Sequence, residues 1–117
     1  MLVVYGIGNC DTCRKARKWL DGQSVAYRFH DFRKDGLEPS TVAAWLAEIG
    51  VDRLVNRRGT TWRKLGDADK QAIEGADAAG AIAGEPTLIK RPVFDLGDRR
   101  LIGFDKDVQS ALAAIGG

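Results

Sequence analysis

The chain has 117 residues, of which 44% are hydrophobic and 29% charged, and this size and composition suit one soluble globular domain. Its 18 basic and 16 acidic residues give a formal net charge of +2, which is too balanced to favour nucleic acid or an anionic membrane as a partner. The apolar runs are too short to span a bilayer, and the first residues do not resemble a secretory signal. We therefore expect a cytoplasmic, monomeric protein.

The first third of the chain predicts a strand, a helix and a second strand. Leu2 to Tyr5 is short, apolar and β-branched, as is typical of a strand, and a loop with two glycines follows it. Apolar residues then recur at helical spacing from Asp11 to Asp21, and Gly22 is expected to end this helix. Val25 to Phe32 alternates between apolar and polar residues, which predicts a strand with one buried face, and Arg33 to Gly36 is typical of a turn.

Helices are predicted in the middle of the chain, and a hairpin and a last helix after them. Pro39 suits the first turn of a helix that runs to about Ile49 and is capped by Gly50. The remaining predicted elements are short helices around Val51 to Val55, Asp67 to Glu74 and Asp77 to Gly84, a turn from Pro86 to Ile89, a hairpin of Val93 to Leu96 with Arg99 to Gly103, and a helix capped by Asp105 that runs through Ile115. The predicted order is β-α-β, a helical stretch, and β-β-α.

The two cysteines form a Cys-x-x-Cys pair at the predicted junction of strand and helix. A helix N-terminus favours a thiolate, and Arg14 and Lys15 add positive charge, so the pKa of Cys10 is expected to fall below the free value of roughly 8.5. Cys13 lies within reach as a candidate resolving thiol, or else Cys10 acts alone and Cys13 is a small buried hydrophobe. A structural zinc site is disfavoured because it needs four ligands and His30 is the only histidine.

Two basic features outside the cysteine loop each allow two interpretations. The bond between Arg91 and Pro92 is either cis, at a strand start that faces the cysteine loop, or trans at a plain strand boundary, and the residues alone do not decide. The segment with Arg57 and Arg58 either meets a carboxylate, a phosphate or an acidic surface, or is simply a solvated face.

Four segments carry a family resemblance that covers nearly the whole chain. They are Val3-Val-Tyr-Gly-Ile-Gly-Asn-Cys-Asp-Thr-Cys-Arg-Lys-Ala-Arg17, Phe29-His-Asp-Phe-Arg-Lys-Asp-Gly36, Leu54-Val-Asn-Arg-Arg-Gly-Thr-Thr-Trp-Arg-Lys-Leu65 and Leu88-Ile-Lys-Arg-Pro-Val-Phe94. Together they resemble the glutaredoxin-like arsenate reductase (ArsC) family, and within it the YffB branch, beside the Spx transcriptional regulators. The resemblance implies an α/β fold, a thioredoxin-like βαβ-ββα sheet in a single domain of residues 1–117. It also implies a helical insertion between the two halves, at about residues 37–85, and a cis bond at Arg91-Pro92 facing Cys10.

The same resemblance implies a cytosolic thiol–disulfide oxidoreductase that binds no cofactor and no metal. Cys10 matches the family's nucleophilic cysteine and Arg91 matches one arginine of its oxyanion-binding set. Cys10, Cys13 and Arg91 are therefore the predicted catalytic residues. The expected partner is glutathione, as a co-substrate, or a protein disulfide. The predicted substrate-binding residues are Asn9, Arg14, Arg57, Arg58 and Pro92.

Two other functions within the family stay open as alternatives. An Spx-like regulator would bind RNA polymerase and use the Cys-x-x-Cys pair as a redox switch. Arsenate reduction is disfavoured, because Asn56 and Phe104 stand where arsenate reductases of this type have two of their three arginines. An apolar ring offers no charge-assisted hydrogen bond to an oxyanion.

Overall fold

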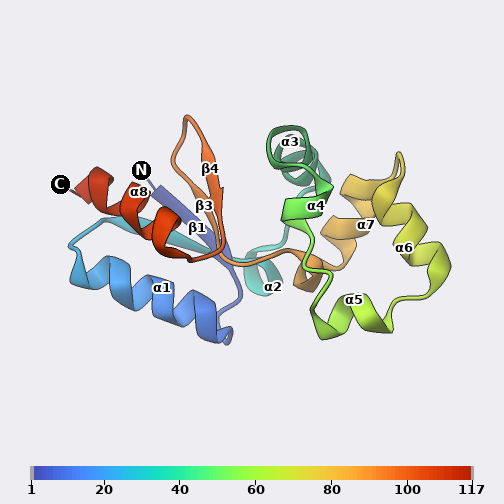
Figure 1. The fold of residues 1–117 in the computed structure, drawn as a ribbon, viewed down its shortest axis with the longest axis horizontal. Helices are drawn as coiled ribbons and strands as arrows, with labels where there is room; N and C mark the ends of the chain where they lie inside the picture. Colours follow the sequence, from blue (N-terminus) through green and yellow to red (C-terminus); the bar gives the residue numbers. More distant parts are fainter. Residues whose placement is uncertain (1, 117) are drawn as a thin grey trace. The chain divides into compact units, whose positions relative to one another are not determined.

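The computed structural model describes residues 2–116, and these form two compact units (Figure 1). Residues 2–35 and 91–116 make up the sheet unit, and Gly36–Lys90 make up the helical unit. The sequence analysis places a helical insertion at about residues 37–85, between the two halves of the sheet. That all 117 residues form a single domain stays a prediction.

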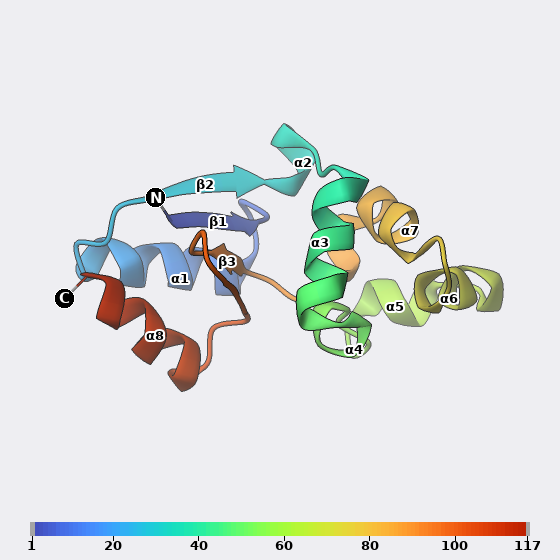
Figure 2. The ribbon, with the colours of Figure 1, turned by 90° about the horizontal axis from the view of Figure 1, so that it is seen from above.

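The sheet unit contains four strands in the order β2-β1-β3-β4, with β1 parallel to β2 and the other two pairs antiparallel. Figure 2 shows β1 and β2 side by side. Its elements are β1 (Leu2–Gly6), α1 (Asp11–Gly22), β2 (Tyr27–Asp31), α2 (Phe32–Asp35), β3 (Val93–Asp95), β4 (Arg100–Ile102) and α8 (Lys106–Gly116). The predicted α/β, thioredoxin-like βαβ-ββα architecture is confirmed.

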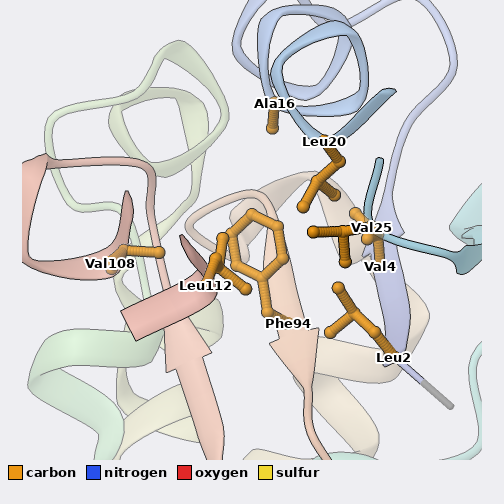
Figure 3. Close-up of a cluster of buried hydrophobic side chains, with 8 residues drawn as sticks. All are labelled: Leu2, Val4, Ala16, Leu20, Val25, Phe94, Val108 and Leu112. Carbon is orange, nitrogen blue, oxygen red and sulfur yellow. The ribbon is translucent and has the colours of Figure 1, made fainter. Parts of the chain in front are cut away.

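Both long helices of this unit cover the same face of the sheet. Val4 of β1 pairs with Phe94 of β3, and both side chains are fully buried on that face. Leu20 from α1 and Leu112 from α8 pack into the same cluster, which Figure 3 shows. Fully burying one such side chain contributes about 1.5–3 kcal/mol, so the apolar stripes of α1 and α8 fix both helices on the sheet. The full cluster is Leu2, Val4, Ala16, Leu20, Val25, Phe94, Val108 and Leu112.

The helical unit is built from short helices around its own apolar core. Its elements are α3 (Pro39–Ile49), α4 (Val51–Leu54), α5 (Thr60–Lys64), α6 (Asp67–Glu74), α7 (Ala78–Gly84) and the 3-10 helix η1 (Pro86–Leu88). Helix α7 contacts both α3 and α6, and Trp45 of α3 is 2% exposed. An antiparallel bridge between Val55, directly after α4, and Ile89, directly after η1, joins two distant parts of the unit. Among residues 2–116, no helix combines the length and the apolar character that a membrane span requires.

Two local predictions are wrong, and a third, the end of α1 at Gly22, is right in its position but not in its left-handed cap residue. The predicted turn at Arg33 to Gly36 begins as a helical turn, α2, because Asp31 Oδ1 accepts the backbone N–H groups of Arg33 and Lys34 at 2.8 and 3.3 Å. Helix α5 lies in a segment for which no helix was predicted. Helix α1 includes Gly22, and the left-handed residue that ends it is Ser24, with φ 56° and the hydrogen bonds of a Schellman motif.

Candidate active site

Cys10 is the N-cap residue of α1 and ends the loop that leaves β1. Its own N–H donates to the carbonyl of Ile7 at 3.1 Å, and its carbonyl accepts the first helical hydrogen bond, from Arg14 N at 2.9 Å. The residue is half-buried. The sulfur therefore lies where a helix presents unpaired N–H groups and partial positive charge.

The surroundings of Cys10 favour its thiolate. Burial raises the pKa of the Cys10 thiol, but three hydrogen bonds act in the opposite direction: one from the backbone N–H of Cys13, one from the Arg91 guanidinium and one from the Cys13 side chain. The positive charge of Arg91 also lowers the pKa, and the net result is a pKa below the ordinary value. A larger fraction of Cys10 is thus available as the nucleophilic form at neutral pH.

Cys13 lies one helical turn after Cys10, and its surroundings disfavour the thiolate instead. Its side chain is 0% exposed. Burial raises the pKa of Cys13 to about 11; a hydrogen bond from Ile7 opposes this, while the nearby Cys10 raises it further. A Cβ atom added at Gly6 would lie 2.5 Å from Cys13 Sγ, so only glycine leaves room for this sulfur against β1. The sequence analysis missed this role of Gly6.

Arg91 and Pro92 stand at the start of the chain segment that enters β3. Their peptide bond is cis, which confirms the conformation that the family resemblance implied. Arg91 is half-buried, while Pro92 is buried and its carbonyl accepts a hydrogen bond from Gly103 N at 2.9 Å. Arg91 belongs to the same unit as the two cysteines and bonds to Cys10, so the three predicted catalytic residues come together.

A buried carboxylate holds the loop that precedes Cys10. Asp31, at the end of β2, is 7% exposed and accepts the N–H of Gly8 at 2.9 Å. Burial raises the pKa of Asp31, but hydrogen bonds from Arg33, Gly8 and Lys34 N–H groups and the charge of Lys34 bring it below its ordinary value. Asp31 was not among the predicted site residues. An aspartate directly after a predicted strand was the signal that could have identified it.

The predicted substrate-binding residues lie in both units. In the sheet unit, Asn9 is exposed in the loop before Cys10, and Arg14 is exposed and forms an ion pair with Asp11. Arg57 and Arg58 belong to the helical unit.

Arg57 already has partners within its own unit. Its guanidinium bonds to Asp52 Oδ1 at 2.7 Å and to Glu74 Oε1 at 2.9 Å, and it lies 5.4 Å from the ring centre of Trp62. Its neighbour Arg58 is exposed. Two carboxylates therefore neutralise one of the two arginines that the sequence analysis assigned to the substrate.

No metal centre is visible in the part of the chain that the structure describes, where no three His, Cys, Asp or Glu side chains are grouped to hold an ion. The only histidine, His30, instead packs its ring 4.8 Å from that of Tyr5.

Comparison with known proteins identifies the family of the chain. The model of the ArsC family matches residues 5–112. A solved structure of a protein named YffB is 44% identical, superposes with a TM-score of 0.89, and covers 97% of this chain and 99% of its own. An uncharacterized protein of Haemophilus influenzae is 43% identical over 97% of this chain and 100% of its own length. The global transcriptional regulator Spx of Streptococcus pyogenes is 29% identical over 92% of this chain and 81% of its own. The chain therefore belongs to the ArsC family, in its YffB and Spx branch.

Proposed function

We propose that the protein is a cytoplasmic, monomeric thiol–disulfide oxidoreductase with Cys10 as its nucleophile and glutathione as its co-substrate. The observation that carries this proposal is the difference between the two sulfurs. Cys10 is accessible and has a lowered pKa, whereas Cys13 is buried with a pKa of about 11. Such a pair supports an attacking thiolate beside a protonated neighbour that donates a hydrogen bond to it.

The proposed first step is attack of the Cys10 thiolate on one sulfur of a disulfide. The substrate S–S bond breaks, a bond forms between Cys10 and the attacked sulfur, and the other sulfur leaves as a thiolate that takes a proton from solvent. Arg91 stabilises the thiolate before the attack through its charge and hydrogen bond. Cys10 is thereby oxidised to a mixed disulfide while one half of the substrate is reduced to a thiol.

The second step returns Cys10 to its reduced form. The thiolate of glutathione attacks the substrate sulfur of the mixed disulfide, forms a new disulfide with it and releases Cys10 as a thiolate. In the alternative route the Cys13 thiolate attacks Cys10 Sγ and releases the substrate half as a thiol, and two glutathione molecules then reduce the resulting Cys10–Cys13 disulfide. The pKa of about 11 leaves little Cys13 thiolate at neutral pH, which supports the external thiol as the main route. Asn9, Arg14, Arg58 and Pro92 stay predicted substrate contacts, and Arg57 is a weaker candidate because of its two carboxylate partners.

A glutathione-coupled disulfide reduction assay tests this function. Cys10→Ser is expected to abolish turnover, because no other described thiol has a lowered pKa. Cys13→Ser is expected to keep part of the activity and serves as the matched control. Full activity of the Cys10→Ser protein would contradict the proposal.

The similarity to Spx favours a second candidate, a redox-switched regulator. In this reading a disulfide between Cys10 and Cys13 is a signal, and the partner is RNA polymerase. Capture of purified RNA polymerase by the oxidised and the reduced protein tests it, and retention in neither state would count against regulation.

Arsenate reduction is the least favoured candidate. Phe104, at one of the positions where arsenate reductases of this type have an arginine, packs its ring 5.7 Å from Trp19 and 6.3 Å from Phe94, against the apolar cluster. This environment suits a ring and not an oxyanion ligand. Thiol consumption that depends on added arsenate would reverse this ranking.

A further inference from the structure

A hollow of about 450 Å³ lies beside the cysteine loop in the sheet unit. Its wall includes residues 7–9, and Asn9 is bonded directly to Cys10, so the Cα atoms of these two residues are about 3.8 Å apart. Three cationic side chains complete the wall, Arg17 from α1 with Arg33 and Lys34 from α2, together with the carboxylate of Asp31. We call this hollow the Arg17 pocket.

Arg17 is held in a defined position but its guanidinium is not fully bonded. The guanidinium carbon lies 4.2 Å from the ring centre of Phe29, which fixes the side chain by stacking. Its Nε atom is buried and has no hydrogen-bond partner among residues 2–116. A buried donor left unsatisfied costs about 1–3 kcal/mol. Arg17 also lines the pocket, so a ligand there can accept from the other N–H groups of the guanidinium.

The carboxylate of Asp31 in the pocket wall already accepts hydrogen bonds from the backbone. Asp31 accepts the backbone N–H groups of Gly8, Arg33 and Lys34. By contrast, no salt bridge within the described residues involves the side chains of Arg17, Arg33 or Lys34. The pocket therefore has an excess of positive charge and cationic groups available to an anion.

We propose that the Arg17 pocket binds a carboxylate of glutathione and so directs glutathione disulfide to Cys10. The inference rests on the proposed function and adds its substrate class: a small disulfide or thiol that carries carboxylates. Arginine fits this role because its planar guanidinium can bind a carboxylate through two parallel hydrogen bonds. In the reaction the Cys10 thiolate breaks the S–S bond of glutathione disulfide, forms the mixed disulfide, and releases one glutathione as a thiol.

The test compares two disulfides in single-turnover reactions with the reduced protein: glutathione disulfide and the uncharged bis(2-hydroxyethyl) disulfide. Formation of the mixed disulfide at Cys10 is followed by mass spectrometry. Arg17→Met, which keeps most of the apolar stem over Phe29, is expected to slow the reaction with glutathione disulfide about tenfold, the loss of one charge-assisted bond. Its reaction with the uncharged disulfide is expected to stay within twofold of wild type. The matched control is Lys18→Met, which removes one charge from the exposed side of the same helix and outside this pocket.

A double variant, Arg33→Gln with Lys34→Gln, tests the pocket at exposed positions where folding is not at risk. It is expected to slow only the reaction with glutathione disulfide, by about threefold, and to weaken the salt dependence of that rate. Two results would overturn the proposal. In one, Arg17→Met and this double variant slow the reactions with the two disulfides equally. In the other, they slow neither reaction.

Binding of S-methylglutathione tests the pocket independently of the redox reaction, because this analogue cannot form a disulfide. NMR titration is expected to shift the Arg17 Nε–H resonance of the wild-type protein, and Arg17→Met is expected to weaken the affinity about tenfold. Equal affinities of wild type and Arg17→Met would overturn the pocket whether or not Cys10 reacts. Normal binding without any mixed disulfide would instead contradict the proposed function.

Discussion

The sheet unit and the helical unit each carry a group of cationic side chains, and the two groups have different neighbours. In the helical unit, Arg57 bonds to the carboxylates of Asp52 and Glu74 at 2.7 and 2.9 Å. In the sheet unit, Arg17 stacks on Phe29 and has a buried Nε without a partner in the part of the chain that is described. A cation that its own chain has already neutralised is less available to a ligand, so Arg17 is a stronger candidate for substrate recognition than Arg57.

The two thiols lie in the sheet unit, as Arg17 does, and this increases the difference between the sheet unit and the helical unit. Cys10, Cys13 and Arg91 all belong to the sheet unit, and each sulfur alters the pKa of the other. If this unit carries the function, substitutions around the cysteine loop have large effects and substitutions in the basic segment of the helical unit have small ones. The following changes test this, from the largest expected effect to the smallest.

Gly6→Ala is expected to destabilise the protein most. The new methyl group would lie 2.5 Å from Cys13 Sγ, and overpacking of this kind costs about 1–3 kcal/mol. Urea denaturation measures the loss of unfolding free energy. The control is Gly6→Ala in a Cys13→Ala background, where the clash is removed and most of the penalty is expected to disappear. A penalty of the same size in both backgrounds would contradict this account.

Asp31→Asn is expected to cost about 2 kcal/mol of unfolding free energy at neutral pH, because hydrogen bonds to a charged acceptor are lost. The pKa of Asp31 is lowered in the folded state, so its contribution is fully present above the unfolded pKa and is lost as pH falls toward the folded one. The stability difference between wild type and variant should therefore shrink as the pH falls below about 4.

Asp98→Asn removes a carboxylate that is exposed in the hairpin turn and is the control for that experiment. It is expected to leave the unfolding free energy nearly unchanged, both at neutral pH and below about pH 4. A difference between wild type and Asp31→Asn that is independent of pH would show that the charge of Asp31 does not stabilise the loop.

Arg91→Met is expected to raise the pKa of Cys10, because the variant loses a hydrogen bond and a positive charge that both lower it. The pH dependence of alkylation by iodoacetamide, an uncharged reagent, gives this pKa directly. Arg99→Met removes an exposed charge from the hairpin and is the control. An unchanged midpoint in Arg91→Met would contradict the role given to Arg91.

Arg57→Gln is expected to have the smallest effect. Exposed ion pairs contribute about 0–1 kcal/mol, so the unfolding free energy should change little. The rate with glutathione disulfide should fall by less than about twofold, well below the effect of Arg17→Met. A larger loss for Arg57→Gln than for Arg17→Met would reverse the comparison and restore Arg57 as the main carboxylate contact.

The order of elements could be predicted because it depends on local patterns. The alternation in β2 and the apolar stripe of α1 give the predicted strand and helix, and Asp105 caps α8 by accepting Val108 N at 2.9 Å. Helix α5 was missed because its five residues, Thr60–Lys64, are too few to show a helical period. The end of α1 at Gly22 was predicted, but its cap was not, because Ser24, and not Gly22, takes the left-handed conformation.

The candidate site could be predicted only where the sequence itself carries the signal. Cys10 and Cys13 are close in the sequence, and the family resemblance added Arg91 from far along the chain. The roles of Gly6 and Asp31 were not predicted, because they depend on contacts that form only in the folded chain. Gly6 contacts Cys13 across the strand–helix junction, and Asp31 bonds to a loop 23 residues earlier.

The pairing of Val4 with Phe94 at the centre of the sheet has a consequence for how the chain folds during synthesis. Both thiols leave the ribosome before the segment Gly36–Lys90, and the strands that complete their sheet come only after it. That segment is continuous and rich in local contacts, so it can form before the sheet closes, whereas non-local strand pairing is slow. The burial that gives Cys13 its high pKa is therefore absent until β3 has been synthesised, and the two sulfurs become chemically unequal only after that point.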